Sequence, residues 1–233
     1  WRWAYASVSV IALGTVAAVA VLLPPQPEEP RQQPLRELRA FNQPQVWLAL
    51  AIGAVGFSGM FCVFSYLAPT LTAVTGVTAA RIPLAMVAFG VGGVLGSILG
   101  GWLFDRMQFR AVPVLLLWSV VVMLTFPLAA QSGVWVFVSI VAVGTMGALA
   151  PALQTRLMDV AAEAQTLAAA SNHAAFNTAN ALGPWLGGMA ITAGWGWTST
   201  GYVGAATALG GLLVYAAAVW QERHRQRAVL TNC

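Results

Sequence analysis

The chain has 233 residues, of which 59% are hydrophobic and only 8% are charged, whereas an ordinary soluble domain has roughly 45–50% apolar and about 25% charged residues. This composition excludes a soluble enzyme. The formal net charge is +4, but the arginines are scattered along the chain and form no single basic face of the kind that binds nucleic acid. The sequence therefore predicts an integral membrane protein that has the lipid bilayer, and no nucleic acid, as its surroundings.

Seven uncharged apolar runs are long enough to cross a bilayer, because a membrane-spanning helix needs about 20 mostly apolar residues. In chain order they cover residues 4–23, 46–68, 82–104, 111–130, 134–154, 167–193 and 199–220. The first run lacks a start Met and a positively charged leader, so it is expected to be a span and not a signal peptide. The predicted fold class is an all-α polytopic membrane protein with seven transmembrane helices.

The first run is followed by a linker over residues 24–45, where Pro24, Pro25, Pro27, Pro30 and Pro34 stand among glutamates and arginines. Proline and charge together exclude a buried continuous helix there. The last run is followed by a charged tail over residues 221–233. The chain is thus divided into residues 1–23, the linker, a six-helix part over residues 46–220, and the tail.

The arginines between the runs predict the orientation, because cytoplasmic flanks of membrane helices carry an excess of Lys and Arg. One set of alternate flanks holds nine arginines and the other holds only Arg2 and Arg81. The linker and the C-terminus are therefore expected in the cytoplasm. An odd number of spans that begins at Trp1 also suggests that the chain is a C-terminal fragment.

Two short motifs recur along the chain in the same order. Residues 67–71 (LAPTL) return as residues 149–153 (LAPAL), 82 positions later, and residues 95–101 (LGSILGG) return as residues 182–188 (LGPWLGG), 87 positions later. Three spans separate each copy from its partner, so the copies would cross the membrane in opposite directions. The sequence predicts an inverted repeat of three plus three helices, an architecture found in secondary transporters. The glycines spaced four apart in these motifs predict close helix packing.

The sixth run carries an unusual number of polar side chains. At 100° per residue, His173, Asn177, Asn180 and Pro184 fall on one stripe of a helix and Asn172 lies to one side. Such groups are costly against lipid, so they either bind a solute or hydrogen-bond neighbouring helices. We expect Asn172, His173, Asn177 and Asn180 to contact a solute. His173 without a second ligand, and two distant cysteines, predict neither a metal site nor a cofactor.

Aromatic and thioether side chains line the second run, and they suit a moderately apolar ligand as well as ordinary packing. They are Phe57, Ser58, Met60, Phe61, Phe64 and Tyr66.

Two functions outside transport remain open. A seven-helix receptor has the same number of spans, although the absence of Lys excludes a retinal Schiff base. An intramembrane serine protease would pair Ser58 with His173, which would then have to lie within hydrogen-bond reach.

The segment 101–106 (GWLFDR) resembles the G-x-L-x-D-R loop signature between the eighth and ninth helices of the major facilitator superfamily. A longer pattern resembles the arabinose-efflux-permease-like branch of its drug:proton antiporters. This pattern comprises Pro151, Leu153, Gln154, Arg156, Met158, Ala161, Glu163, Ala164, Asn172 and residues 175–177, 180–183 and 187–188.

The resemblance implies that residues 46–220 are the C-terminal six-helix half of such a transporter. Residues 1–23 would then be the last helix of the N-terminal half, residues 24–45 the cytoplasmic linker between the halves, and residues 221–233 a cytoplasmic tail. The implied activity is proton-coupled efflux of a small polar or amphiphilic solute, a sugar or a drug, by alternating access across a bacterial inner membrane. Such a protein is not an enzyme, and its partners are the solute, the proton and the missing N-terminal six-helix half.

The resemblance also implies roles for individual residues. Asp105 and Arg106, which follow Gly100 and Gly101, would belong to the cytoplasmic gate. Helices seven and ten line the central cavity of this fold, which adds Phe57, Phe61, Met146 and Gln154 to the substrate-binding residues. No acidic residue lies inside the seven runs, so the proton-coupling carboxylate is expected in the missing half.

Overall fold

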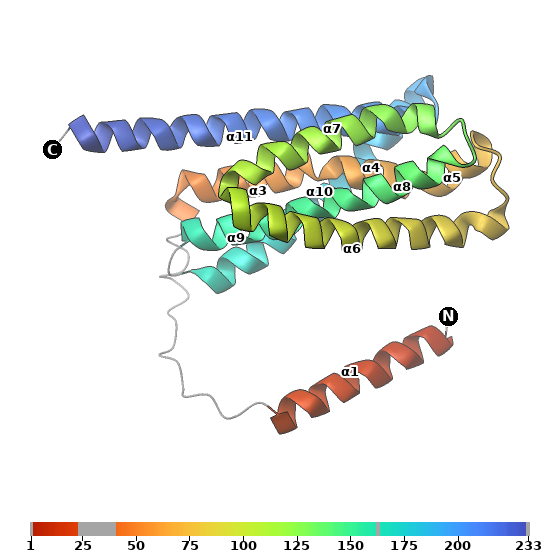
Figure 1. The fold of residues 1–233 in the computed structure, drawn as a ribbon, viewed down its shortest axis with the longest axis horizontal. Coiled ribbons are helices and arrows are strands. Elements are labelled where there is room, and N and C mark those ends of the chain that lie inside the picture. The colour runs from red at the N-terminus through yellow and green to blue at the C-terminus, as the bar shows by residue number, and fades with distance from the viewer. Residues whose placement is uncertain (1, 23–40, 162–163, 232–233) are drawn as a thin grey trace. The chain divides into compact units, whose positions relative to one another are not determined.

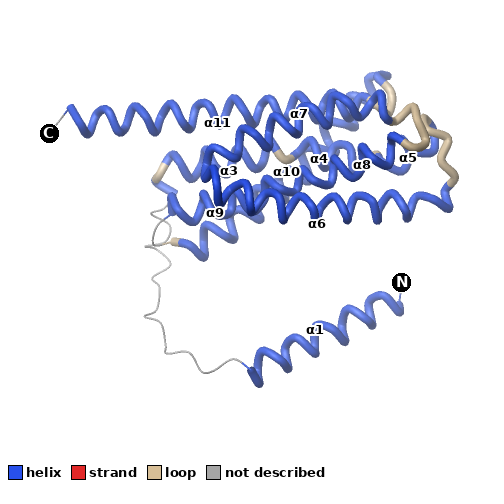
Figure 2. The backbone as a smooth tube through the Cα atoms, in the orientation of Figure 1, coloured by secondary structure: helices blue, strands red, loops and turns tan. Residues whose placement is uncertain are grey.

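A computed structural model describes residues 2–22, 41–161 and 164–231, and every long element in these ranges is a helix (Figures 1 and 2). The helices are α1 (Arg2–Leu22), α3 (Pro44–Gly56), α4 (Ser58–Ser65), α5 (Leu67–Ala73), α6 (Ile82–Met107), α7 (Ala111–Ala129), α8 (Trp135–Thr145), α9 (Leu149–Ala161), α10 (Gln165–Ala190) and α11 (Ser199–Thr231). Short 3₁₀ turns precede α6, α7 and α9, and a π-helical turn, Ile191–Trp195, follows α10.

The chain divides into two compact units, residues 1–34 and 35–233. In the first unit, α1 exposes each of its described side chains. Its hydroxyl groups are satisfied locally, because Ser7, Ser9 and Thr15 each donate to the carbonyl oxygen four residues earlier. A helix with mostly apolar side chains outside, whose hydroxyl groups bond to its own backbone, is suited to contact with lipid.

The second unit is a bundle in which α6 lies against α8, α10 against α4, and α11 against α3, α4 and α7. Its core consists of large side chains with almost no exposed surface, among them Ile52, Leu116, Met123, Phe126 and Leu153. Many other large apolar side chains of α6, α7 and α10 are exposed, including Val87, Leu117 and Trp185. Apolar surface on this scale is expected where a bundle contacts lipid or another membrane domain.

The turns between the helices are made by residues suited to them. Proline stands at the start of α3 and of α6, where its missing N–H group costs nothing. After α10 the chain turns at Gly194 and Gly196, which have φ angles of 87° and 79°, a region that favours glycine. Between α6 and α7 the chain turns at Gln108, which has a φ angle of 52°.

Within the described residues, five helical segments are long and apolar enough to cross a membrane, by length and composition alone. They are Tyr5–Leu22, Pro44–Ser65, Ala79–Ala129, Trp135–Ala161 and Ser199–Arg225. The third is 51 residues long and holds two antiparallel helices, α6 and α7 (Figure 1). The helix α10 is 26 residues long but more polar and is not among the five, so the described helices match the predicted seven spans only approximately.

Two helices continue past the ends of their predicted spans. The predicted fifth span ends at residue 154 and the seventh at residue 220, whereas α9 continues to Ala161 and α11 to Thr231. Charge marks where a helix leaves the hydrocarbon, whereas the helical hydrogen bonds continue beyond that point. The linker predicted over residues 24–45 lies mostly outside the described residues, and α3 begins at Pro44.

The glycine motifs pack reciprocally between the two repeats. A Cβ atom added at Gly96 of α6 would lie 2.5 Å from the carbonyl oxygen of Thr145 in α8, and one added at Gly183 of α10 would meet the carbonyl oxygen of Ser58 in α4. Gly183 stands 87 positions after Gly96, and Thr145 stands 87 positions after Ser58. Because α6 and α10 run in opposite directions (Figure 1), this is the contact pattern of an inverted repeat.

The other motif does not follow the same register. Leu67 begins the short helix α5, after most of its span has passed, whereas Leu149 begins α9 in the middle of its span. The 82-position match therefore joins unlike places in the two repeats, which is expected of a chance match in a sequence rich in Leu and Ala.

Candidate functional site

An open groove lies between the first helices of the two repeats, with α6 as its third wall. Its volume is about 570 Å³, and it is lined by Phe57, Met60, Phe89, Gly90, Gly93, Val94, Ser97, Ile98, Gly144, Gly147 and Ala150. We call it the glycine groove. Ser97, its one hydroxyl side chain, donates to the carbonyl oxygen of Gly93 at 2.9 Å. The groove therefore presents an apolar wall to anything that enters it.

Aromatic rings border this groove. The ring of Phe57 contacts Phe61 edge-on, with 5.5 Å between centroids, and Phe176 of α10 at 4.7 Å. Phe57 stands where α3 gives way to α4 and is only 6% exposed. The break in the helix turns the Phe57 ring onto the groove, and Phe61 contacts that ring; their part in substrate binding stays a prediction.

Met146 and Gln154 follow one another along the fifth span but lie in different surroundings. Met146 is 2% exposed and belongs to the core, while its neighbours Gly144 and Gly147 line the groove. Gln154 accepts a hydrogen bond of 2.9 Å from the side-chain amide of Asn172. The carbonyl oxygen of that Asn172 side chain is buried without a hydrogen-bond partner in the described structure, so the pair retains an acceptor that is not used.

The remaining polar residues predicted on α10 lie outside the packed face. Asn172 is buried, whereas His173, Asn177 and Asn180 are exposed, and none of the three hydrogen-bonds another described residue. We call these three residues the amide stripe. The face that packs on α4 is marked by Gly183 and Gly187, whose added Cβ atoms would meet Ser58 and Cys62. The stripe lies beside that face, free to contact a solute or a further domain.

The repeat relates the amide stripe to the glycine groove. Asn177 stands 87 positions after Gly90, and Asn180 stands 87 positions after Gly93. Gly96, the packed glycine of α6, and Gly183, the packed glycine of α10, are also 87 positions apart. The stripe and the groove are therefore equivalent flanks of two equivalent helices. Sequence reasoning had not singled out Gly90 and Gly93, although the 87-position shift was enough to find them.

The predicted gating residues stand at the end of α6. Asp105 and Arg106 are exposed, and the Arg106 guanidinium stacks over the Trp102 ring at 4.5 Å from its centroid. Gly100 packs against the backbone of Ala148, whereas a Cβ atom at Gly101 would meet no atom within 4 Å. The first glycine is thus needed for packing and the second is not.

A cluster that sequence reasoning missed lies at the same end of the bundle. Arg156 of α9 forms an ion pair of 3.0 Å with Glu222 of α11. Its guanidinium also stacks over Phe109 at 4.3 Å, and Phe109 contacts Tyr215 of α11 at 4.9 Å. These contacts join α9, α11 and the 3₁₀ turn between α6 and α7. The partners are far apart in the sequence, so no local pattern could have paired them.

The protease alternative is wrong. Ser58 is fully buried, and its hydroxyl donates to the carbonyl oxygen of Val55 at 2.7 Å. The residue of α10 that meets Ser58 is Gly183, which lies ten residues, or about 15 Å of helix, beyond His173. The two side chains therefore cannot form a catalytic pair.

Among the side chains that the structure describes, no group of three His, Cys, Asp or Glu residues could hold a metal ion. What the described arrangement offers is an apolar groove, an aromatic cluster that borders it and a stripe of amides on α10. These features can bind an uncharged or amphiphilic molecule, since ring and alkyl groups suit the groove and hydroxyl or carbonyl groups suit the amides.

Comparison with known proteins gives matches over nearly the whole chain. The family model described as the Major Facilitator Superfamily matches residues 1–144 and 62–231. The inner membrane transport protein YdhP of Escherichia coli (strain K12) is 34% identical over 94% of this chain and 57% of its own length. The putative transporter AraJ of the same strain is 28% identical over 83% of this chain and 50% of its own length.

A third relative carries a more specific name. The chloramphenicol resistance protein of Streptomyces lividans is 36% identical over 65% of this chain and 39% of its own length. The chain spans about half the length of the curated relatives that it matches along most of its own length.

Proposed function

Because the chain belongs to the Major Facilitator Superfamily, we propose that it is the C-terminal half of an exporter of a small polar or amphiphilic solute, a sugar or a drug. Transporters of this architecture bind their substrates near the bilayer midplane, between repeats, and work by alternating access. The other participant would be an N-terminal half of six helices, of which α1 is the last. In this arrangement the bundle of α3–α11 moves against its partner half as one body in the inner membrane, with its C-terminus in the cytoplasm.

One observation carries the proposal: the glycine groove and the amide stripe are equivalent flanks of α6 and α10. In an inverted repeat such flanks face the same central space from two sides. Phe57 and Phe61 would hold the apolar part of the solute. Asn177, Asn180 and His173 would hydrogen-bond its polar groups, and the Gln154–Asn172 pair would supply the spare acceptor.

We further propose that export is driven by protons. Every Asp and Glu of this chain lies outside its apolar runs, and intramembrane carboxylates are the usual proton carriers of transporters. The coupling carboxylate is therefore assigned to the N-terminal half. Asp105 and Arg106 would act in the cytoplasmic gate, together with the turn that Gly100 and Gly101 precede.

The test is an efflux assay on the complete protein, expressed in cells without their own exporters and loaded with labelled chloramphenicol or, separately, arabinose. Chloramphenicol is the first probe because a relative is named for resistance to it and because it combines an aromatic ring with polar groups. We expect export of one probe, and an ionophore that collapses the proton gradient should abolish it.

The site is tested with the double variant Asn177→Ala/Asn180→Ala. Loss of two hydrogen bonds of about 0.5–1.5 kcal/mol each should slow export about tenfold. Thr178→Ala is the matched control, because Thr178 is exposed on the same helix and its hydroxyl only donates to the carbonyl oxygen of Ala174. Unchanged export by the double variant would refute the site, and equal losses in the double variant and the control would point to damage of α10 itself.

A further inference from the structure

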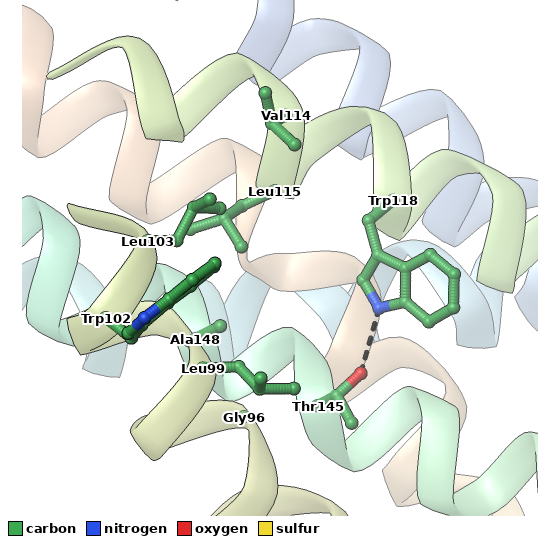
Figure 3. A pocket seen from close by; sticks show the side chains of 9 residues that line it. All are labelled: Gly96, Leu99, Trp102, Leu103, Val114, Leu115, Trp118, Thr145 and Ala148. Carbon is green, nitrogen blue, oxygen red and sulfur yellow. Dashed lines mark hydrogen bonds between the residues drawn. The ribbon is translucent and has the colours of Figure 1, made fainter. Parts of the chain in front are cut away.

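A second groove lies on the other flank of α6, between α6 and α7, with α8 and the turn after it as its floor (Figure 3). Its volume is about 300 Å³. The walls are formed by Leu99, Trp102 and Leu103 of α6 and by Val114 and Trp118 of α7. We call it the tryptophan groove.

The tryptophan groove has no free polar group in its lining. The indole N–H group of Trp118 donates to the hydroxyl of Thr145 at 2.9 Å (Figure 3), and that hydroxyl donates to the carbonyl oxygen of Ala142 at 2.6 Å. All other lining side chains are apolar. A site whose hydrogen bonds are already made accepts hydrocarbon and rejects polar ligands.

The groove would open toward lipid. The glycines of α6 that pack on α8 separate the glycine groove from the tryptophan groove. This step rests on the proposed function: if the glycine groove faces the substrate path, the opposite flank faces the bilayer. Its side chains are indeed left half exposed by the bundle, with Leu99 at 55%, Trp102 at 52% and Trp118 at 45%.

Arginines stand at one end of both walls. Arg106 follows Trp102 by one helical turn on α6 and stacks over its ring. Arg110 precedes Val114 by one turn at the start of α7. Both are exposed, and neither forms an ion pair with a described residue. Asp105 is adjacent to Arg106 in the sequence, but on a helix it points about 100° away from it.

The dimensions fit one leaflet. From Gly96 to Arg106 the groove follows ten residues of α6, about 15 Å, which is half of a hydrocarbon core of ~30 Å. A cationic end and an apolar trough of one-leaflet length are complementary to one kind of molecule: an anionic amphiphile with a long chain.

We propose that the tryptophan groove binds an anionic phospholipid, with an acyl chain between α6 and α7 and the phosphate between Arg106 and Arg110. The Trp102 ring lies between the two parts of the ligand, covering the chain while it holds the Arg106 guanidinium in place. Such a lipid fills the gap between two helices that share few other contacts and thereby fixes the end of α6, where Asp105 lies.

The test is native mass spectrometry of the complete protein in detergent, titrated with phosphatidylglycerol that has 16-carbon chains. Each arginine near a lipid phosphate contributes about a fivefold gain in affinity, so Arg106→Gln/Arg110→Gln should weaken binding about 20-fold or more. Arg223→Gln is the matched control, since Arg223 is exposed at the same end of the bundle on α11, and it should bind the lipid like the unaltered protein.

Two further measurements distinguish the contribution of the acyl chains to lipid binding from that of the phosphate. Glycerol phosphate, which lacks acyl chains, should not bind, and Val114→Trp, which fills the trough, should weaken phosphatidylglycerol binding while the arginines remain. Unchanged binding in the double arginine variant, equal loss in Arg223→Gln, or equal binding of glycerol phosphate would each overturn the proposal. A thermal melt of each variant checks that the protein is folded.

The readout is binding and requires no transported solute. If phosphatidylglycerol binds as expected while Asn177→Ala/Asn180→Ala leaves export unchanged, the substrate site fails and the lipid site stands. If export depends on the amide stripe but the arginine variants retain the lipid, the lipid site fails and the proposed function stands.

Discussion

The exposed flanks of α6 and α10 occupy equivalent places in the two repeats, yet they offer opposite chemistry. On α6, a Cβ atom added at Gly90 or Gly93 would meet no other atom within 4 Å, and these two glycines leave an apolar groove open. On α10 the positions 87 residues later are Asn177 and Asn180, so the equivalent flank of α10 carries amides. The two copies of the repeat thus give the proposed site an apolar wall on α6 and a polar wall on α10.

The packed faces of the same two helices are alike. Gly96 and Gly183 both lie against the backbone of a neighbouring helix, and any side chain there would force the helices apart. Positions that face a backbone are restricted to glycine in both copies, whereas positions that face a cavity are free to differ. The differences between the copies therefore indicate where binding chemistry is placed, and the likenesses indicate where the bundle is held together.

The largest expected effect comes from replacing the packed glycines that α6 and α10 have in common. Gly96→Ala and Gly183→Ala should each destabilise the bundle by about 2 kcal/mol, because the new methyl group meets a backbone carbonyl that cannot move aside. Thermal unfolding in detergent measures this loss. Gly93→Ala is the matched control on α6 and should melt like the unaltered protein. A large effect in only one of the two packed glycines would contradict the reciprocal packing.

The next largest effect is expected when α6 is given the amide side chains that α10 carries at the equivalent positions. Gly90→Asn/Gly93→Asn should fold normally, since neither position has another atom within 4 Å of an added Cβ atom. Placing amides in an apolar groove costs the apolar part of the solute about 1–3 kcal/mol, so export of chloramphenicol should fall about tenfold in the efflux assay. Gly133→Asn, at another open glycine in a loop, should export normally. Normal export by the groove variant would remove the apolar wall from the site.

Much of the fold could be predicted because the hydrocarbon core imposes a length and a composition on each span. The 87-position match between residues 95–101 and 182–188 also predicted the packing correctly, since small residues four apart identify a contact face without knowledge of the partner. Helix ends were less predictable. The helices α9 and α11 continue past the ends of their uncharged runs, through charged residues, and Leu157 and Ala161 in the extension of α9 are buried by packing that no local pattern predicts.

The site was predictable only in part, for a different reason. The residue types of α10 identified a polar stripe, but their division into a buried Asn172 and an exposed Asn177 and Asn180 depends on which face packs against α4. The pairing of Asn172 with Gln154 and of Arg156 with Glu222 depends on contacts between spans. Such contacts follow from the assembled bundle and not from any one segment.

A smaller effect is expected at the end of α6, where the copies differ in charge. Asp105 has Thr192 as its counterpart 87 positions later, so only the first copy carries an acid there. Asp105→Asn should slow turnover a few-fold and change the half-saturating solute concentration less, as expected for a gate that the solute does not touch. Transport kinetics in proteoliposomes measure the turnover rate and the half-saturating concentration separately. Asp159→Asn, an exposed acid on α9, is the control, and a variant of Asp105 with unchanged turnover would contradict the gate role.

The smallest effect concerns the ion pair between α9 and α11, which has no counterpart among the described contacts of the other repeat. Glu222 is 40% exposed and Arg156 is 15% exposed, so a double-mutant cycle of Arg156→Gln and Glu222→Gln should give a coupling of about 0.5 kcal/mol, reduced by added salt. Arg156→Gln should nevertheless cost more than Glu222→Gln, by about 0.5–1 kcal/mol, because it also removes the stacking on Phe109. Equal losses in the two single variants would mean that the stacked ring adds nothing, and α9 would then be held to α11 by charge alone.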